Sequence, residues 1–211
     1  MIPTPPPSNY GGIADWLDVK WSDLQNDRLG RYEQWLRDEA VVAGGIGPRE
    51  GPRLFDRHLA DSLAFLTLID GSATSLIDVG SGVGLPGIPI AIARPDIDVT
   101  VLDRSERRVR LAARAVRILG LENVSITNVD VSQTQGMYDV VAFRASLPIE
   151  DAERAFRRLA CPDGIGIFAW SRRDEPKSPP EPPTDTIFSL TPEGVGVLQS
   201  PAWLLRMQRS P

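Results

Sequence analysis

The spacing of apolar residues changes along this chain of 211 residues. Residues 14–43 carry apolar side chains at mixed three- and four-residue steps, which predicts one or two short amphipathic helices. Glycine and proline interrupt the pattern over residues 44–52, and a further helix is predicted over residues 54–68. Its inward-facing positions are expected to be Leu54, Leu59, Leu63, Phe65 and Leu66.

From residue 75 onward, short apolar runs alternate with helical periodicity. Predicted strands cover residues 75–79, 98–102, 124–128, 138–143 and 164–170, and predicted helices start at Pro86 and cover residues 106–119 and 149–160. Such alternation is typical of a doubly wound, mainly parallel α/β sheet of the Rossmann-like class. Two more β-like stretches, residues 186–190 and 203–207, could close the sheet as an antiparallel pair.

One hydrophobic core with attachments is the expected domain organisation, because 211 residues that are 42% hydrophobic suit a single well-packed domain. The proline-rich start, residues 1–12, is predicted to be a disordered tail. Residues 13–70 are predicted to form a helical cap and residues 71–211 the main α/β domain. Within that domain, residues 172–183 carry five prolines among charges and are expected to form an exposed loop.

Composition argues against several classes of protein. No apolar run reaches the roughly 18 to 20 residues that cross a bilayer, and the N-terminus lacks the pattern of a signal peptide, so a cytoplasmic location is predicted. With one cysteine, Cys161, and one histidine, His58, the chain cannot form an internal disulfide or a Cys/His zinc site, and we expect no metal. The net charge of −5 means that any contact with RNA must be local.

A glycine-rich segment follows the predicted strand at residues 75–79. It reads Leu76-Ile77-Asp78-Val79-Gly80-Ser81-Gly82-Val83-Gly84-Leu85-Pro86-Gly87. Glycines let the backbone turn sharply and let a ligand approach closely, and the following helix start offers free N–H groups. The segment is therefore predicted to be a ligand-binding loop, although residues 82–87 also satisfy the dinucleotide pattern G-x-G-x-x-G, which is weak evidence alone.

Two features favour S-adenosylmethionine over a dinucleotide as the ligand. Asp78 ends the strand two residues before the first glycine, where a carboxylate can meet the cofactor's ammonium group. Pro86 occupies the helix start, where a dinucleotide fold prefers free amides for pyrophosphate. Asp103 ends the next predicted strand and could accept the ribose hydroxyls of either cofactor, so it does not discriminate. A purely structural loop, with glycines for turns and the aspartate as a cap, stays the alternative.

The predicted helix at residues 106–119 carries a stripe of arginines. Its apolar face is expected to hold Val109, Ala112, Ala113, Val116 and Leu119, and the opposite face Arg107, Arg110, Arg114 and Arg117. The stripe could contact phosphates, or it could be an ordinary solvated helix face. Both interpretations stay open, the second especially for Arg114 and Arg117.

The order of several short motifs resembles the RsmG (GidB) methyltransferases. These motifs are Gly47-Pro48-Arg49-Glu50, Leu54-Phe55-Asp56-Arg57-His58-Leu59 with Asp61-Ser62, the glycine loop continued through Ile88-Pro89, Ala93-Arg94-Pro95, and Arg144-Ala145. The resemblance covers about residues 44–173 and implies a class I methyltransferase fold. It also implies transfer of a methyl group from S-adenosylmethionine to nitrogen 7 of a guanine in 16S ribosomal RNA, free or in the 30S subunit. That nitrogen has a free lone pair at neutral pH, so positioning and desolvation can carry the rate without a general base. We expect the protein to be a monomer.

The resemblance assigns roles to individual residues. The implied cofactor-binding residues are Asp78, Gly80, Ser81, Gly82, Gly84, Leu85, Pro86, Asp103, Arg104, Asp130, Val131, Ser132 and Arg144. Arg57, His58 and Arg144 would line the guanine side as the catalytic residues. His58 could instead be a structural histidine bonded to a carboxylate such as Asp61, and Cys161 is expected to be structural.

Three positions depart from the family pattern. Phe143 stands where the family has serine before Arg-Ala, Ser132 replaces an acidic residue, and Trp170 takes the position of a lysine. Arg172 or Arg173 could compensate for the lost charge, and Trp170 could stack on a base. These departures leave two alternatives open: a diverged relative that methylates a small molecule or another RNA position, and a non-catalytic protein that binds S-adenosylmethionine. An NAD-linked dehydrogenase is disfavoured because no acid–base group for hydride transfer stands out.

Overall fold

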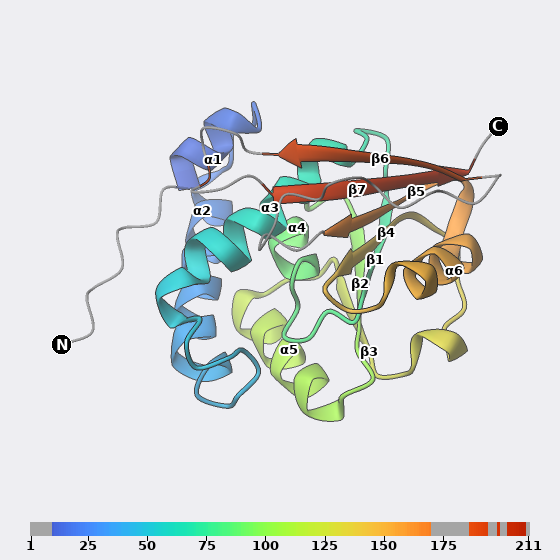
Figure 1. The fold of residues 1–211 in the computed structure, drawn as a ribbon. Helices are drawn as coiled ribbons and strands as arrows, with labels where there is room; N and C mark the ends of the chain where they lie inside the picture. The colour runs from blue at the N-terminus through green and yellow to red at the C-terminus, as the bar shows by residue number, and fades with distance from the viewer. Residues whose placement is uncertain (1–9, 170–185, 194–197, 199–201, 210–211) are drawn as a thin grey trace.

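A seven-stranded sheet forms the centre of the protein in the computed structural model, which describes residues 10–169, 186–193, 198 and 202–209 (Figure 1). The strands are β1 (Ser75–Val79), β2 (Asp98–Leu102), β3 (Val124–Thr127), β4 (Tyr138–Arg144), β5 (Ala160–Ala169), β6 (Thr186–Glu193) and β7 (Ala202–Arg209). Their order across the sheet is β3-β2-β1-β4-β5-β7-β6, with β1 to β5 parallel and β7 antiparallel to both β5 and β6. The predicted parallel sheet with an antiparallel closing pair is confirmed.

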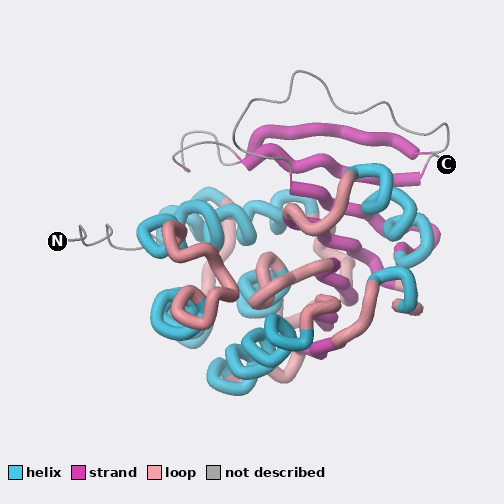
Figure 2. Tube along the Cα trace, turned by 60° about the horizontal axis from the view of Figure 1, so that its bottom comes forward, coloured by secondary structure: helices cyan, strands magenta, loops and turns pink. Residues whose placement is uncertain are grey.

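Helices cover both faces of this sheet, as Figure 2 shows. They are α1 (Tyr10–Trp16), α2 (Asp23–Trp35), η1 (Leu36–Ala40), η2 (Gly51–Arg53), η3 (Leu54–Ala60), α3 (Asp61–Ala64), η4 (Phe65–Leu68), α4 (Gly87–Ala93), α5 (Glu106–Leu119), η5 (Val131–Gln133) and α6 (Ile149–Leu159). The elements from α1 to η4 precede the first strand and are all helical, and they are called the cap below; η1 and η3 are π-helical and η2 and η4 are 3₁₀-helical.

Two clusters of buried apolar side chains lie on the two faces of the sheet. Successive residues of a strand point to opposite faces, so β1 contributes Leu76 to one cluster and Ile77 and Val79 to the other. The first cluster also contains Val99 of β2 and residues of α2, α3, α4 and α5, whereas the second contains Phe156 of α6. The larger core therefore lies between the sheet and the cap.

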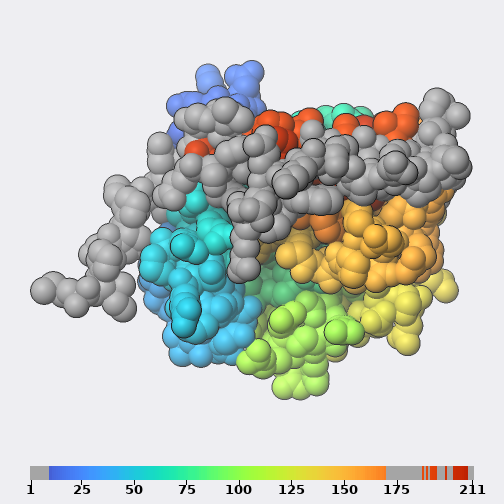
Figure 3. Space-filling model, viewed as in Figure 1, coloured from blue at the N-terminus to red at the C-terminus, as the bar shows by residue number. Residues whose placement is uncertain are grey.

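The helix α4 explains why the cap is needed. All seven of its residues, Gly87-Ile88-Pro89-Ile90-Ala91-Ile92-Ala93, are buried, and a helix that is apolar all round must be covered on every side. Both α2 and α3 contact α4, while its other side faces β1 and β2. Figure 3 shows the blue and cyan surface of the cap against the yellow-green surface of the α5 region, which α2 also contacts.

Polar side chains of α2 hold the ends of two helices. Gln25 Nε2 donates hydrogen bonds to the carbonyl oxygens of Ile92 and Ala93, at 3.2 and 3.0 Å, where α4 ends. Arg28 Nε donates to the carbonyl of Leu119 at 3.0 Å, where α5 ends. Helix ends leave carbonyls without intrahelical partners, so these bonds fix α2 across both helices.

Several boundaries differ from the sequence prediction. The chain is helical from Tyr10, so residues 10–12 are not disordered. On α5, Ala113 is exposed and Ala115 is buried in its place, because the helix turns a slightly different face to the sheet. Leu66 is only half-buried. Residues 1–9, Trp170, Arg172, Arg173 and the proline-rich stretch 172–183 lie outside the described residues.

Candidate active site

The order of the strands places the site. β1 lies between β2 and β4, so the chain winds outward in opposite directions from the β1–β4 pair. In open α/β sheets, ligands bind in the crevice outside the carboxyl ends of the strands at such a reversal. The glycine loop leaves β1 at this edge, and Arg144 is the last residue of β4.

The glycine loop needs its glycines for two different reasons. Gly80, Gly82 and Gly84 all have positive φ, of 69°, 61° and 103°. A Cβ on Gly80 would lie 2.5 Å from Cβ of Ser146, and a Cβ on Gly84 would lie 2.3 Å from Cδ1 of Ile88. At Gly82, by contrast, an added Cβ would meet nothing within 4 Å, so that residue faces open space. The loop therefore packs tightly at its ends and is open in the middle, as a cradle for a ligand requires.

A glycine-to-alanine pair tests this description of the loop. Gly84→Ala is expected to lower the free energy of unfolding by about 2–4 kcal/mol, because it adds a clash with Ile88 to the strain of a positive φ. Gly82→Ala adds only the strain, about 1–2 kcal/mol. Urea denaturation of both variants measures the difference. An equal cost for the two would contradict the tight packing at Gly84.

Asp78 is completely buried beneath the loop. Its Oδ2 accepts a hydrogen bond from the backbone N–H of Gly87 at 2.7 Å, whereas its Oδ1 has no hydrogen-bond partner. Burial raises the pKa of Asp78 to about 7, although the Gly87 N–H and the charge of Arg144 act in the opposite direction. One oxygen of the carboxylate thus fixes the start of α4, and the other stays available.

Asp103 holds the loop from the neighbouring strand. Its Oδ2 accepts from the N–H of Gly82 at 2.9 Å, and its Oδ1 accepts from the N–H of Ser105 at 2.7 Å. The side chain of Arg108 lies 3.7 Å away, and the carboxylate is almost fully buried. The structure therefore shows Asp103 stabilising the loop, and its contact with a ribose stays a prediction.

The cap helix α2 also reaches the loop. The hydroxyl of Tyr32, which is fully buried, donates a hydrogen bond to the carbonyl oxygen of Val83 at 2.9 Å. The ring of Tyr32 stacks on that of Trp35 with centroids 5.9 Å apart. This hydrogen bond spans 51 residues and joins the cap to the middle of the glycine loop.

Tyr32→Phe is expected to weaken binding of the predicted cofactor, S-adenosylmethionine, severalfold. The variant keeps the stacked ring but leaves a buried carbonyl of the loop without this donor, which costs about 1–2 kcal/mol. Calorimetric titration with S-adenosylhomocysteine measures the change. Tyr138→Phe removes a hydroxyl from a half-buried ring on β4 and serves as the control. Equal affinities of the Tyr32 variant and the unmodified protein would show that this bond does not shape the loop.

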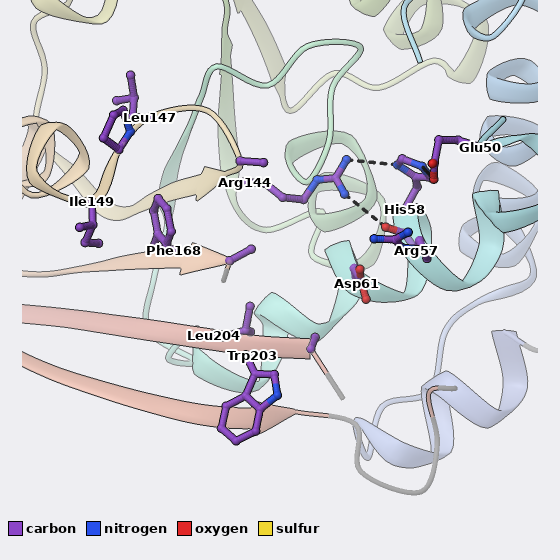
Figure 4. Close-up of a pocket in the computed structure, with 14 residues that line it drawn as sticks. Glu50, Arg57, His58, Asp61, Arg144, Leu147, Ile149, Phe168, Trp203 and Leu204 are labelled. Atoms are coloured by element: carbon purple, nitrogen blue, oxygen red, sulfur yellow. Dashed lines mark hydrogen bonds and ion pairs between the residues drawn. The ribbon is translucent and has the colours of Figure 1, made fainter. Parts of the chain in front are cut away.

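A cavity of about 620 Å³ opens beside Arg144. It is lined by Glu50, Arg57, His58, Asp61, Arg144, Ala145, Leu147, Pro148, Ile149, Phe168, Ala169, Ala202, Trp203 and Leu204. Figure 4 shows that the charged side chains, from the segment between Glu50 and Asp61 and from the end of β4, form one wall, while Leu147, Ile149 and Phe168 lie opposite. One wall can therefore bond polar edges, and the other offers apolar contact.

The charged wall contains all three residues that the resemblance assigns to catalysis. Arg144 Nη1 lies 3.3 Å from the carbonyl oxygen of Arg57, to which it donates, and Arg144 Nη2 lies 3.3 Å from His58 Nδ1. The Nε2 atom of His58 is 3.2 Å from Oε2 of Glu50. Burial lowers the pKa of His58 to about 4, helped by Arg144 and opposed by Glu50, and burial also lowers the pKa of Arg144.

Four buried polar atoms gather between the loop and the cavity. Among the described residues, five buried side-chain polar atoms have no hydrogen-bond partner: Trp35 Nε1 in the cap, and Asp78 Oδ1, Ser81 Oγ, Arg144 Nε and Ser146 Oγ at the ends of β1 and β4. Buried polar groups are normally bonded, so these four atoms are available to a ligand that carries both donors and acceptors. The sequence reasoning missed Ser146. Ala145, with a positive φ of 52°, makes the turn that brings Ser146 against Gly80.

The remaining sequence-predicted residues lie away from the cavity. Asp130 caps η5 by accepting from the N–H and the hydroxyl of Ser132, at 2.9 and 2.7 Å. These hydrogen bonds, followed by the charges of Arg104 and Arg158, lower the pKa of Asp130. Val131 is half-buried in the same turn. The cofactor contact that the resemblance implies at this turn stays a prediction.

Phe143, the departure before Arg144, does not line the cavity but packs behind its apolar wall. It is fully buried in the cluster on the α6 face, and its ring lies 6.5 Å from that of Phe168. The exchange of serine for phenylalanine at this position therefore changes the core rather than the charged wall.

Most of the arginine stripe on α5 is explained by contacts within the protein. Arg107 donates to the carbonyl oxygens of Ala43 and Gly44, at 2.9 and 3.0 Å. Arg110 pairs with Glu106, and Arg114 pairs with Glu39 of the cap. These bonds favour the structural interpretation for the three arginines, while Arg117 is exposed.

Comparison with known proteins agrees with this arrangement. A family model described as rRNA small subunit methyltransferase G (GidB) matches residues 25–175. The ribosomal RNA small subunit methyltransferase G of Kineococcus radiotolerans is 40% identical over 127 residues, which cover 59% of this chain and 50% of that protein. That of Mycobacterium sp. (strain KMS) is 40% identical over 145 residues, covering 67% of this chain and 60% of that protein. The matches thus span between half and three fifths of these relatives.

Solved structures show the same fold. A protein from Klebsiella pneumoniae, assigned as an O-methyltransferase, has a crystal structure that matches this chain with a TM-score of 0.58. The two sequences are 10% identical, and the match covers 92% of each chain. The Escherichia coli protein yhhF, assigned as a methyltransferase, matches with a TM-score of 0.55 and 9% identity over 74% of this chain and 90% of that chain. The sheet is therefore that of the Rossmann-like class I methyltransferases. It departs from the all-parallel order of dinucleotide-binding domains through the antiparallel β7.

Within the described part of the chain, no helix combines the length and apolar character needed to span a membrane. The family model covers well over half of the 211 residues, including the glycine loop and the charged wall of the cavity. The chain belongs to the rRNA small subunit methyltransferase G (GidB) family.

Proposed function

We propose that the protein transfers a methyl group from S-adenosylmethionine to nitrogen 7 of a guanine in 16S ribosomal RNA. The observation that carries this proposal is the cluster of four unpaired buried polar atoms between the glycine loop and the cavity. Family membership supplies the reaction class. We further propose that the protein acts in the cytoplasm, as a monomer and without a metal.

The residues at the β1–β4 crevice fit the cofactor. Asp78 Oδ1 offers an acceptor for its ammonium group, while Arg144 Nε and the hydroxyls of Ser81 and Ser146 offer donors for its carboxylate. The open face of Gly82 leaves room for it to lie against the loop. Asp103, Arg104 and the turn at residues 130–132 are proposed for its ribose and adenine. When bound, S-adenosylmethionine supplies an electrophilic methyl group.

The cavity supplies what a guanine needs. A base requires a slot with an apolar face and donors at its edge, and the two walls of the cavity provide both. The guanidinium of Arg144 can donate to the carbonyl oxygen of guanine, and this interaction orients the neighbouring nitrogen 7. His58 is neutral at physiological pH and is held between two other side chains, so it acts by positioning rather than as a base.

Methyl transfer to 30S subunits that lack the guanine modification tests the proposal. The protein is incubated with labelled S-adenosylmethionine and these subunits, beside Asp78→Ala, and the RNA is analysed as nucleosides. Label in 7-methylguanosine that disappears in the variant is the expected result. If the protein binds S-adenosylhomocysteine but transfers no label to the subunits, the proposed substrate is wrong. Labelling of a different nucleoside would point to another RNA position.

A further inference from the structure

Glu50 lies at the rim of the cavity and contacts Arg144 only through His58. Its Oε2 is 3.2 Å from His58 Nε2, and Nδ1 of the same ring is 3.3 Å from Arg144 Nη2. Figure 4 shows the three side chains in a row, running from the segment before η3 to the end of β4. Glu50 and Arg144 both line the cavity, so the row forms part of its charged wall.

The chemistry of these groups allows one arrangement of protons. A guanidinium has only donors, so His58 Nδ1 must be the acceptor of the bond from Arg144. The single proton of a neutral imidazole then sits on Nε2, and this N–H donates to the carboxylate of Glu50. Arg144 thus donates to His58, and His58 donates to Glu50.

The charges around His58 keep this arrangement. Arg144 faces it from β4, Arg57 lies beside it on η3, and Glu50 faces it from the start of η2, while Asp61 lines the same cavity from α3. Burial and the two arginines lower the pKa of His58 to about 4. A second ring proton would also sit on Nδ1, where it would face an N–H of Arg144. The ring is therefore neutral at the pH of an assay.

The guanidinium of Arg144 is fixed through the same contacts. Its Nη1 donates to the carbonyl of Arg57 at 3.3 Å and its Nη2 to His58, so both bonds come from the η3 turn. The backbone carbonyl of Arg57 holds Nη1 of Arg144 in place. The position of Nη2, by contrast, depends on the orientation of the His58 ring. The ring can rotate about its own bonds unless Nε2 is held as well.

We propose that Glu50 is a positioning residue: it accepts the Nε2 proton of His58, fixes the ring, and thereby sets the plane in which Arg144 meets the substrate. This inference rests on the proposed function, in which Arg144 contacts the guanine. It assigns to Glu50 a role in catalysis without contact between Glu50 and the reacting atoms.

A double-mutant cycle measures whether Glu50 acts through His58. Glu50→Ala is expected to lower kcat about tenfold while KM for S-adenosylmethionine changes less than about twofold, and Glu50→Gln, which keeps an acceptor oxygen, should recover most of the rate. In a His58→Ala background, Glu50→Ala should cost less than about twofold, because the group that it positions is gone. Glu122→Gln, an exposed residue in the turn after α5, is the control for loss of a carboxylate.

Nuclear magnetic resonance gives a second readout that does not depend on activity. His58 is the only histidine, so ¹⁵N labelling of histidine yields one pair of ring signals. The expected spectrum at pH 7 shows protonated Nε2 and bare Nδ1. The positive charge of Arg144 lowers the pKa of His58, so Arg144→Met should raise that pKa. The negative charge of Glu50 raises the pKa of His58, so Glu50→Gln should lower it.

Two outcomes would overturn the proposal. One is an equal cost of Glu50→Ala with and without His58; the other is a ring that is charged, or protonated on Nδ1, at pH 7. If Glu50→Ala does not fold, Glu50→Gln and the ring signals decide the question. Absence of methyl transfer in the unmodified protein would refute the proposed function, whereas the ring signals would still show whether Glu50 and Arg144 hold His58 as inferred.

Discussion

At pH 5, S-adenosylhomocysteine is expected to bind about 100-fold more weakly than at pH 8, because Asp78 must be ionised to meet the ammonium group of the ligand. Burial raises the pKa of this carboxyl to about 7, so it is mostly neutral in a mildly acidic solution. Below the pKa, each unit of pH lowers the ionised fraction about tenfold. The affinity is therefore present above pH 7 and is lost as the pH falls.

Asp78→Asn separates the charge from the shape of the side chain. The variant is expected to bind about 100-fold more weakly than the unmodified protein at pH 8, with an affinity that no longer changes between pH 5 and pH 8. Calorimetry in two buffers of different ionisation heat measures both the affinity and the uptake or release of a proton. Near pH 6, the unmodified protein should release a proton on binding, and the variant should release none.

Asp139→Asn is a suitable control for this prediction. Asp139 Oδ2 accepts hydrogen bonds from the backbone N–H groups of Thr74 and Ser75, at 2.8 and 3.0 Å, at the opposite end of β1. Its loss should cost stability but leave the affinity for the ligand and its pH dependence unchanged. A binding constant that is flat from pH 5 to pH 8 in the unmodified protein would show that Asp78 does not meet the ammonium group.

The sequence predicted the α/β sheet well because its signals are local. The bounds of β1, β2 and α5 agree with the prediction, and α5 is delimited by Ser105 before it and by Gly120 after it, which adopts the left-handed conformation with φ of 61°. Apolar strands and the ends of helices can be predicted from the pattern of a few neighbouring residues. The helices of the cap were less well predicted. Residues 51–68 form several π- and 3₁₀-helical turns, whose type and bounds depend on tertiary contacts that no local pattern encodes.

In the candidate site too, the parts formed by contiguous residues were predicted, and the contacts between distant residues were not. The motif placed the glycine loop and Asp78, because the residues that form them are contiguous. The resemblance placed Arg57, His58 and Arg144, and the structure brings them together in one cavity wall. The partner of His58 could not be foreseen. Glu50 precedes it by eight residues across an irregular turn, and helical spacing pointed to Asp61 instead.

Only the structure shows whether the residues that depart from the family pattern lie in the cavity. Phe143 stands next to Arg144 in the sequence, where the family has serine. Successive side chains of β4 point to opposite faces of the sheet, so Phe143 packs in the cluster that contains residues of α6. The exposed hydroxyl of Ser132 donates to Asp130, which caps η5, so this side chain is engaged within its own turn. Neither exchange touches the charged wall of the cavity, and both are therefore compatible with the proposed reaction.

Arg144→Met is expected to lower methyl transfer about 100-fold or more, because two charge-assisted hydrogen bonds and the donor to the substrate are lost together. The variant should also move the midpoint of the pH dependence of ligand binding above 7, since the charge of Arg144 lowers the pKa of Asp78. Rates are measured with 30S subunits, and midpoints by the calorimetric titration.

Arg144→Lys distinguishes the charge of this residue from its geometry. A lysine ammonium keeps the positive charge near Asp78, so the midpoint for ligand binding should stay near that of the unmodified protein. It cannot reproduce the planar fork that reaches both the Arg57 carbonyl and His58, so methyl transfer should stay about 100-fold low. Arg154→Met, which removes an exposed arginine of α6, should alter neither quantity. Full activity of the lysine variant would mean that the site needs only a positive charge at this position, and the row from Glu50 to Arg144 would then have no geometric role in the reaction.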